Sequence, residues 1–313
     1  MSSPTTSIVV RALNEAEHLP RLIEGLKHQT VQPDEVILVD SGSTDDSVAI
    51  AEAAGWKIVH IAKKDFSFGR SLNWGCQAAT GEILVMLSAH VYPVYDTYLE
   101  HMLKPFERPE TGISYGRQVG DERTKFSESR VMLKWFPEES IFDQGHPFSN
   151  NANAAVRKSL WEIYKYDEEL TGLEDLEFAR RAQADGHRIA YVAEAPVVHV
   201  HEETWATVRN RYRREAIAYA RIMDEKHMGA FEAIKLGISN TASDYVHAIK
   251  SREFWKHVTS IPAFRYAQFY GAWEGFRTVG TISEDLKNRF YYPTDPVADE
   301  RPQEPGQKIN YTK

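Results

Sequence analysis

The sequence is poor in several features that would assign it to a familiar class of protein. One cysteine, Cys76, occurs among 313 residues, which excludes an internal disulfide and any site built from several thiolates, and a reducing compartment such as the cytoplasm is expected. No run approaches the about 18 apolar residues of a membrane-spanning helix. The chain starts with a short polar stretch, without the apolar segment of a secretory signal. A net charge of −8 argues against a nucleic-acid partner.

Glycine is missing where a dinucleotide site would need it. A first strand is predicted over residues 8–10, and the sequence continues as Arg11-Ala12-Leu13-Asn14-Glu15 instead of Gly-x-Gly-x-x-Gly. A nicotinamide-dependent dehydrogenase is therefore disfavoured. With 42% hydrophobic residues, the chain can bury a sizeable core and forms one large or two modest domains.

The first hundred residues carry repeated strand-to-helix units. The central unit is the apolar run 36–39, which ends at Asp40 and continues through Ser41 and Gly42 into a helix expected over residues 47–54. A strand that ends in this way places carboxylates and free backbone N–H groups at the carboxyl edge of a sheet, where open α/β sheets bind nucleotides. The same residues are equally typical of an ordinary turn and helix N-cap.

Further units surround the central one. Asn14, followed by Glu17, resembles a capping box at the start of a helix with apolar residues on one face. Additional strands are predicted over residues 56–61 and 82–87, with a helix over 70–79 between them. Because these apolar runs do not alternate with polar residues, they indicate strands buried on both faces. The predicted fold class is α/β, a Rossmann-like and mainly parallel sheet flanked by helices.

Three segments together resemble the successive signatures of the family 2 glycosyltransferases of the GT-A fold. They are SIVVRALNE at residues 7–15, VDSGSTD at 39–45 and ATGEILVML at 79–87. The resemblance, which extends to about residue 200, implies inverting transfer of a sugar from a UDP-, dTDP- or GDP-sugar to a glycan or lipid-linked acceptor, usually with Mn²⁺ or Mg²⁺, in polysaccharide biosynthesis. The donor-binding residues that it implies are Arg11, Ala12, Asn14, Glu15, Asp40, Ser41, Gly42, Arg70 and Ser88.

The sequence departs from this family after the fourth predicted strand. The family usually has an Asp-x-Asp motif there, whereas this chain has Ser88-Ala89-His90. Loss of both carboxylates weakens the case for magnesium, which prefers oxygen ligands. His90 resembles the Asp-x-His variant of polypeptide N-acetylgalactosaminyltransferases, and imidazole binds transition metals, so His90 is a candidate ligand. The alternatives are a hydrogen bond to the diphosphate, or an ordinary loop histidine, in a metal-independent enzyme.

Two adjacent acids, Glu174 and Asp175, open a helix that is predicted to end near Gly186. Acids in a first turn are favoured by the helix dipole alone. The pair also matches the Glu-Asp pair of family 2 enzymes, whose aspartate resembles a general base. Because successive helical residues point about 100° apart, only one acid can face an acceptor. We expect Asp175 to be the base and Glu174 to orient the acceptor or complete a metal site.

His199 and His201 follow a Val-rich segment in which two closing strands are expected, at residues 191–192 and 197–201. With the strand period of two, both side chains lie on one face and could reach His90. A histidine here resembles the late metal ligand of several GT-A enzymes, so His201 is the second candidate ligand. Histidines on such a strand are otherwise structural.

The rest of the chain is divided by composition. Residues 1–120 form the nucleotide-sugar-binding half, and residues 121–204 the acceptor half, in which 121–147 is expected to be a lid or an irregular part. Residues 205–292 are predicted to be helical and 293–313 disordered. Five arginines between 209 and 221 form a solvated face, a diphosphate contact or a docking surface for an anionic membrane.

The aromatic residues of the later helices leave three interpretations open. They fit core packing, a homodimer interface or contact with the inner face of the membrane, which would make a cytoplasmic enzyme peripheral. Another class of function is a non-catalytic nucleotide-sugar-binding or assembly protein that lost its Asp-x-Asp acids. The retained Glu174-Asp175 pair argues against that loss.

Overall fold

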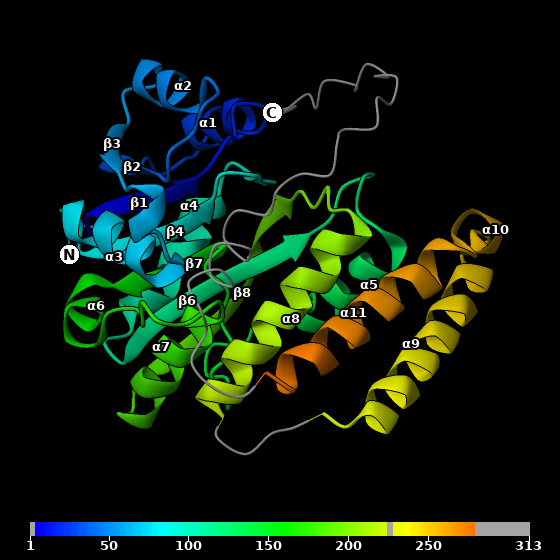
Figure 1. Ribbon diagram of the computed structural model, residues 1–313. Helices are drawn as coiled ribbons and strands as arrows, with labels where there is room; N and C mark the ends of the chain where they lie inside the picture. Colours follow the sequence, from blue (N-terminus) through cyan, green and yellow to red (C-terminus); the bar gives the residue numbers. More distant parts are fainter. Residues whose placement is uncertain (1–3, 224–227, 279–313) are drawn as a thin grey trace.

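An eight-stranded sheet forms the centre of the computed structural model, which describes residues 4–223 and 228–278 (Figure 1). Its strand order is β3-β2-β1-β4-β7-β6-β8-β5. The strands are β1 (Thr6–Ala12), β2 (Glu35–Asp40), β3 (Lys57–His60), β4 (Ile83–Ser88), β5 (Val91–Pro93), β6 (Thr111–Val119), β7 (Asn153–Arg157) and β8 (Arg188–His199).

Parallel pairing dominates the first half of the sheet. Strand β1 lies between β2 and β4 and is parallel to both, and β3 is parallel to β2. Strand β7 is antiparallel to β4 and β6, whereas β6 and β8 are parallel. The predicted fold class is confirmed, and the carboxyl ends of β1, β2 and β4 meet at one edge.

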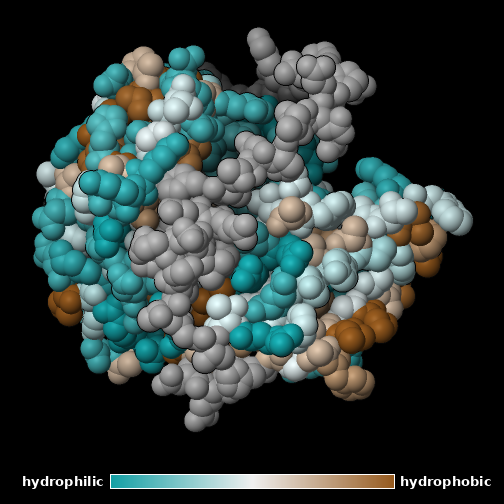
Figure 2. Space-filling view, viewed as in Figure 1, coloured by the Kyte–Doolittle hydropathy of each residue, from teal (hydrophilic) through white to brown (hydrophobic). Residues whose placement is uncertain are grey.

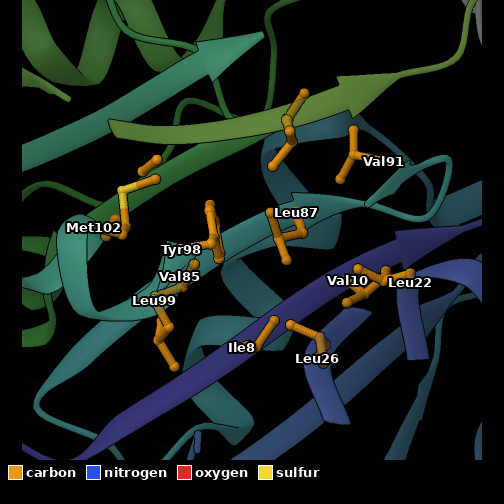
Figure 3. Close-up of a cluster of buried hydrophobic side chains, with 14 of the residues drawn as sticks. Ile8, Val10, Leu22, Leu26, Val85, Leu87, Val91, Tyr98, Leu99 and Met102 are labelled. Atoms are coloured by element: carbon orange, nitrogen blue, oxygen red, sulfur yellow. The ribbon is translucent and has the colours of Figure 1, made fainter. Parts of the chain in front are cut away.

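Helices cover both faces of the sheet. The α-helices are α1 (Leu19–Lys27), α2 (Ser47–Ala53), α3 (Phe68–Ala78), α4 (Tyr98–Leu103), α5 (Phe126–Trp135), α6 (Lys158–Tyr164), α7 (Glu174–Ala184), α8 (Trp205–Ile222), α9 (Ala230–Lys250), α10 (Phe254–His257) and α11 (Ser260–Phe276), with short 3₁₀ helices η1 (Lys63–Asp65) and η2 (Lys104–Glu107). One buried cluster joins α1 and α4 to β1 and β4, where Leu22, Leu26 and Tyr98 pack over Ile8 and Val85 (Figure 3).

The opposite face packs against α3, α6 and α7. Gly75 of α3 lies so close to the sheet that an added Cβ would come within 2.3 Å of Val9 and 2.8 Å of Val39. The absent side chain allows this close approach. It brings the start of α3 next to the edge at which β1 and β2 end.

Three local expectations were wrong. Helix α1 begins at Leu19 after His18, not at an Asn14 capping box, because Asn14 adopts a φ of 55° and bonds to the loop after β2 instead. The two expected closing strands are one strand, β8, whose pairing with β6 shifts register between Gly116 and Gln118. The segment 121–147 contains α5, whose Met132 packs into the core.

The C-terminal helices pack beside the sheet. Helices α8 and α11 lie in close contact, since added Cβ atoms on Gly271 and Gly275 would each come within 2.3 Å of a backbone oxygen of α8. Helix α9 covers α11 less closely, and an apolar groove of about 710 Å³ runs between them. Within residues 4–223 and 228–278, none of the helices combines the length and apolarity that a bilayer crossing needs. Residues 279–292 of the predicted helical region, and the predicted disordered tail 293–313, lie outside the described residues.

Candidate active site

The loops that follow β1 and β2 are joined by hydrogen bonds. The side-chain oxygen of Asn14 accepts from the backbone N–H of Thr44 at 2.8 Å, and the N–H groups of Asn14 and Glu15 donate to the hydroxyls of Ser43 and Ser47 at 2.9 and 2.7 Å. The sequence-predicted donor residues on these loops therefore lie next to one another. They form one rim of a polar surface at the carboxyl edge of the sheet.

Asp40 holds the turn after β2. Its carboxylate accepts the N–H groups of Ser43 at 2.9 Å and Gly42 at 3.2 Å, and lies 3.3 Å from His60 Nδ1. Burial would raise the pKa of Asp40, but these hydrogen bonds outweigh it and hold the pKa below its usual value. Gly42 has a φ of 95°, which favours glycine. Ser41 donates through its hydroxyl and its N–H to the Ala12 carbonyl, both at 3.1 Å.

Arg11 connects this edge to the helix that carries the two acids. Its Nη1 lies 3.3 Å from Glu174 Oε1, and its guanidinium lies over the Phe68 ring, 5.2 Å from the ring centre. Glu174 is buried. Arg11 therefore compensates a carboxylate that would be costly to bury alone.

Asp175 lies beside Glu174 at the first turn of α7, after Leu173, which has a φ of 57°. One carboxylate oxygen accepts the N–H of Asn151 at 3.0 Å and the other accepts the N–H of Leu176 at 2.8 Å. Burial and the negative charge of Glu174 outweigh these bonds and raise the pKa of Asp175 to about 7. A carboxylate with this pKa can exchange a proton at neutral pH.

A polar cavity of about 130 Å³ opens onto these acids, with room for a few water-sized groups. It is lined by Arg11, Phe68, Asn150, Gly172, Leu173, Glu174, Asp175, Arg214 and Glu215. The Arg214 guanidinium lies 4.4 Å from the centre of the Phe68 ring. Arg214 and Glu215 come from α8, and sequence reasoning did not single out Glu215.

Three histidines gather near the end of β4. The rings of His90 and His199 stack with centres 5.1 Å apart, and the Nε2 atoms of His199 and His201 are 3.0 Å apart. Burial, with the neighbouring His201, His90 and Arg211, holds the pKa of His199 well below its usual value. The structure thus brings together the two predicted ligands, His90 and His201, with His199 between them.

Further charged residues lie beside the histidines. Glu128 of α5 accepts from His201 Nδ1 at 2.7 Å and from Arg211 at 2.5 Å. Burial opposes ionisation of Glu128, but the hydrogen bond from His201 and the charge of Arg211 lower its pKa to about 2. Arg211 also pairs with Glu203 at 2.6 Å, so it is not part of a solvated face. No pattern in the sequence identified Glu128.

Two predicted donor residues have other surroundings. Arg70 in α3 donates to Glu168 at 2.6 Å and to the Asp65 carbonyl at 2.8 Å. Ser88 ends β4, two residues before His90, and its N–H donates to the Ala152 carbonyl at 3.4 Å. Contact of either residue with a donor sugar stays a prediction.

Comparisons with known proteins agree with this fold. Residues 7–163, half of the chain, match the family model described as glycosyl transferase family 2. The chain is 24% identical over 226 residues to O-antigen chain rhamnosyltransferase RfbN of Salmonella typhimurium, covering 68% of this chain and 72% of the relative. It is 27% identical over 203 residues to rhamnosyltransferase WbaN of Salmonella anatum, covering 61% and 64%.

Solved structures share the architecture at low sequence identity. A mannosyltransferase from Pyrobaculum calidifontis, solved with GDP-Man and Mn²⁺, has a TM-score of 0.61 and 16% identity over 87% of this chain and 88% of its own. GalNAc-T7, solved with UDP, GalNAc and Mn²⁺, has a TM-score of 0.53 and 16% identity over 80% and 58%. The chain belongs to glycosyl transferase family 2 and is a glycosyltransferase of the GT-A fold.

Proposed function

We propose that the protein transfers a sugar from a nucleoside diphosphate sugar to an acceptor hydroxyl, with inversion and with Asp175 as the general base. The observation that carries this proposal is a carboxylate whose pKa is raised to about 7 at the mouth of a polar cavity. The acceptor O–H gives its proton to Asp175 while its oxygen attacks the anomeric carbon. The bond from that carbon to the diphosphate breaks, and the nucleoside diphosphate leaves.

The other residues of the site have supporting roles in this proposal. Arg11 fixes Glu174, and Glu174 in turn raises the proton affinity of Asp175 and orients the acceptor. The donor nucleotide lies against the loops that carry Asn14, Asp40 and Gly42, with Ala12, Glu15 and Ser41 shaping that surface and Arg70 and Ser88 toward the diphosphate. The two Salmonella relatives are named O-antigen chain rhamnosyltransferases, which favours a deoxyhexosyl donor and a glycan or lipid-linked acceptor in polysaccharide synthesis.

The histidines offer a divalent metal better ligands than the end of β4 does by itself. His90 and His201 offer imidazole nitrogens where the family usually has carboxylates, and such ligands suit a transition metal more than magnesium. When bound, the metal would act as a Lewis acid toward the leaving diphosphate. Both solved relatives described above contain Mn²⁺.

A panel of UDP-, dTDP- and GDP-sugars tests the proposed activity. We expect one donor to be hydrolysed slowly without acceptor, with release of the nucleoside diphosphate, because water can take the place of the acceptor hydroxyl. Release is measured with Mn²⁺, with Mg²⁺ and with a chelator, and isothermal calorimetry measures donor binding separately. Binding without release, with or without glycan acceptors, would instead identify a non-catalytic sugar-nucleotide-binding protein.

We also propose that the outer face of α9 and α10 docks on an anionic membrane surface. Phe231, Ile234 and Trp255 are 82%, 61% and 84% exposed, and apolar side chains gather over α9 in Figure 2. Four exposed cations flank them: Lys235, Lys250, Arg252 and Lys256. Apolar residues beside basic ones are typical of helices that lie in a membrane interface. The inner face of the membrane, and residence in the cytoplasm, stay predictions.

Vesicle binding checks this docking surface. We expect the protein to sediment with vesicles that contain phosphatidylglycerol and not with neutral ones, and we expect Ile234→Ser with Ile238→Ser to weaken binding at least about tenfold through lost apolar burial. Ile163→Ser, which alters an equally exposed isoleucine on α6, serves as the control. A dimer that the double substitution dissociates, with no vesicle binding, would assign the face to a second copy.

A further inference from the structure

The cavity beside Asp175 contains a third carboxyl group that the proposed mechanism does not use. Glu215 comes from α8, whereas Glu174 and Asp175 come from α7, and all three line the cavity of about 130 Å³. Glu174 pairs with Arg11, and Asp175 accepts two backbone N–H groups. Within the part of the chain that the structure describes, the carboxyl group of Glu215 forms neither a hydrogen bond nor an ion pair.

Two arginines of the same helix lie near Glu215, but both have other contacts. Arg211, one turn earlier, pairs with two other glutamates at 2.5 and 2.6 Å. The guanidinium of Arg214 lies 4.4 Å from the centre of the Phe68 ring. Burial raises the pKa of Glu215 above its usual value, although the charges of Arg211 and Arg214 oppose this shift. A partly buried carboxyl group without hydrogen bonds costs free energy, and the hydroxyl groups of a ligand in the cavity would supply the missing donors.

Another part of the cavity wall offers a hydrogen-bond donor. The side-chain oxygen of Asn150 accepts the N–H of Ala152 at 2.9 Å. Because a backbone N–H can only donate, this contact identifies the bonded atom as the oxygen and the other end of the amide as the NH₂ group. Among the residues with described positions, none accepts a hydrogen bond from that NH₂ group. The cavity wall therefore presents an acceptor, Glu215, and a donor, Asn150, to a ligand.

The hydroxyl groups of a sugar match these two side chains, because a hydroxyl both donates and accepts hydrogen bonds. The cavity of about 130 Å³ holds a few water-sized groups, so it suits the edge of one sugar ring and not a whole sugar residue. The hydroxyl that gives its proton to Asp175 must lie within hydrogen-bond reach of that carboxylate. Hydroxyls that enter the cavity beside it therefore belong to the acceptor. Three carboxyl groups in one cavity disfavour an acidic sugar, since like charges placed together are costly.

We propose that Glu215 and Asn150 bind the hydroxyl groups next to the reacting one and thereby select a neutral acceptor sugar. Glu215 accepts from one hydroxyl, and the NH₂ group of Asn150 donates to the same oxygen or to the adjacent one. With Asp175 on the reacting hydroxyl, the acceptor ring is held at more than one point, so only a hydroxyl at the right ring position reaches the base. The inference rests on the proposed function for the identity of the acceptor site, but sugar binding can be measured without turnover.

Binding of simple glycosides to the full chain tests this inference. The probes are the methyl glycosides of rhamnose, mannose, galactose and glucose, with that of glucuronic acid as the acidic counterpart of glucose, measured by saturation-transfer NMR with UDP, dTDP or GDP present. We expect at least one neutral glycoside to bind in the millimolar range and the glucuronoside not to bind. Glu215→Ala, which loses no partner within the described fold, should weaken binding at least about tenfold, the effect of one lost hydrogen bond to a charged group. Asn150→Asp keeps the oxygen that holds Ala152 but replaces the donor with an acceptor, so it should weaken binding similarly.

Deoxy glycosides distinguish direct contact from an effect on the fold. Removing the hydroxyl that Glu215 contacts should weaken binding to the unaltered protein but have little further effect on Glu215→Ala, because the same hydrogen bond is lost in both cases. Glu162→Ala, which removes an exposed carboxyl group on α6, is the control and should bind like the unaltered protein.

The outcomes separate this inference from the transfer reaction. Glycoside binding that depends on Glu215, in a protein that transfers no sugar, would support the sugar-binding site and overturn only the proposed reaction. Transfer whose acceptor KM is the same in Glu215→Ala would overturn the inference and leave the reaction. Absence of binding by every neutral glycoside, or equal affinity in a folded Glu215→Ala, would also overturn the inference.

Discussion

Asp175→Asn is expected to lower kcat about a hundred- to ten-thousandfold, the usual contribution of a positioned general base. The amide cannot take the acceptor proton, whereas it keeps the size of the carboxylate and can still accept one of the two N–H groups, that of Asn151 or that of Leu176, through its single oxygen. Donor binding should change little, because this acid is proposed to face the acceptor. Steady-state release of the nucleoside diphosphate, with calorimetry for donor affinity, measures the two effects separately.

Glu177→Gln is the matched control for this change. Glu177 lies on the same first turns of α7, but its carboxylate pairs with Arg181 at 2.6 Å instead of lining the cavity. The substitution removes a similar helix-dipole interaction without touching the proposed base. If Asp175→Asn kept its kcat within about threefold, below the range expected of a general base, the proposed role would be wrong.

The pH dependence gives the same substitution a second readout. Because burial and Glu174 raise the pKa of Asp175 to about 7, the rate should fall below pH 7 as the base becomes protonated. Between the ordinary aspartate pKa of 3.8 and about 7, the folded state holds a proton that the unfolded state has lost. The free energy of unfolding therefore decreases as pH rises through this window, and Asp175→Asn should lose this decrease.

The sheet could be predicted because its central strands are apolar along their whole length. The runs that end at Asp40 and Ser88 match β2 and β4 within a residue or two, since a parallel strand buried on both faces needs no alternation. Helix α5 was missed because its apolar residues are interspersed with charges. Asn14 was misassigned because its hydrogen-bond partner, Thr44, belongs to the next loop, and such a contact follows only from the folded sheet.

The candidate site, too, could be predicted only in part from the sequence. Asp175 and the histidines could be selected because few residue types perform acid–base or metal chemistry. Their partners could not, since Glu128 is separated from His201 by 73 residues and nothing in its own surroundings in the sequence distinguishes it. The pKa of Asp175 is raised by burial, which follows only from the folded chain, and by the adjacent Glu174, and it is lowered by Arg11, which lies 163 residues from Glu174 in the sequence.

Asn73→Ala should destabilise the protein by about 3–5 kcal/mol, because several buried polar groups would each lose a hydrogen bond worth about 1–3 kcal/mol when left unmade. The Asn73 side-chain oxygen accepts from Trp161 Nε1 at 3.1 Å and from the Tyr166 N–H at 2.9 Å. Its Nδ2 donates to the Tyr166 carbonyl at 2.9 Å and to Glu168 at 3.0 Å. Denaturant unfolding should show a lower midpoint with an unchanged slope.

Gln77→Ala provides the control. Gln77 lies one turn beyond Asn73 on the same helix, α3, but its side chain is exposed to solvent. Alanine has the higher helix propensity at both positions, so propensity alone would stabilise both variants slightly. A loss of stability confined to Asn73→Ala must then come from the buried hydrogen bonds. Equal midpoints for the two variants would show that the buried hydrogen bonds of Asn73 to Trp161, Tyr166 and Glu168 do not stabilise the fold.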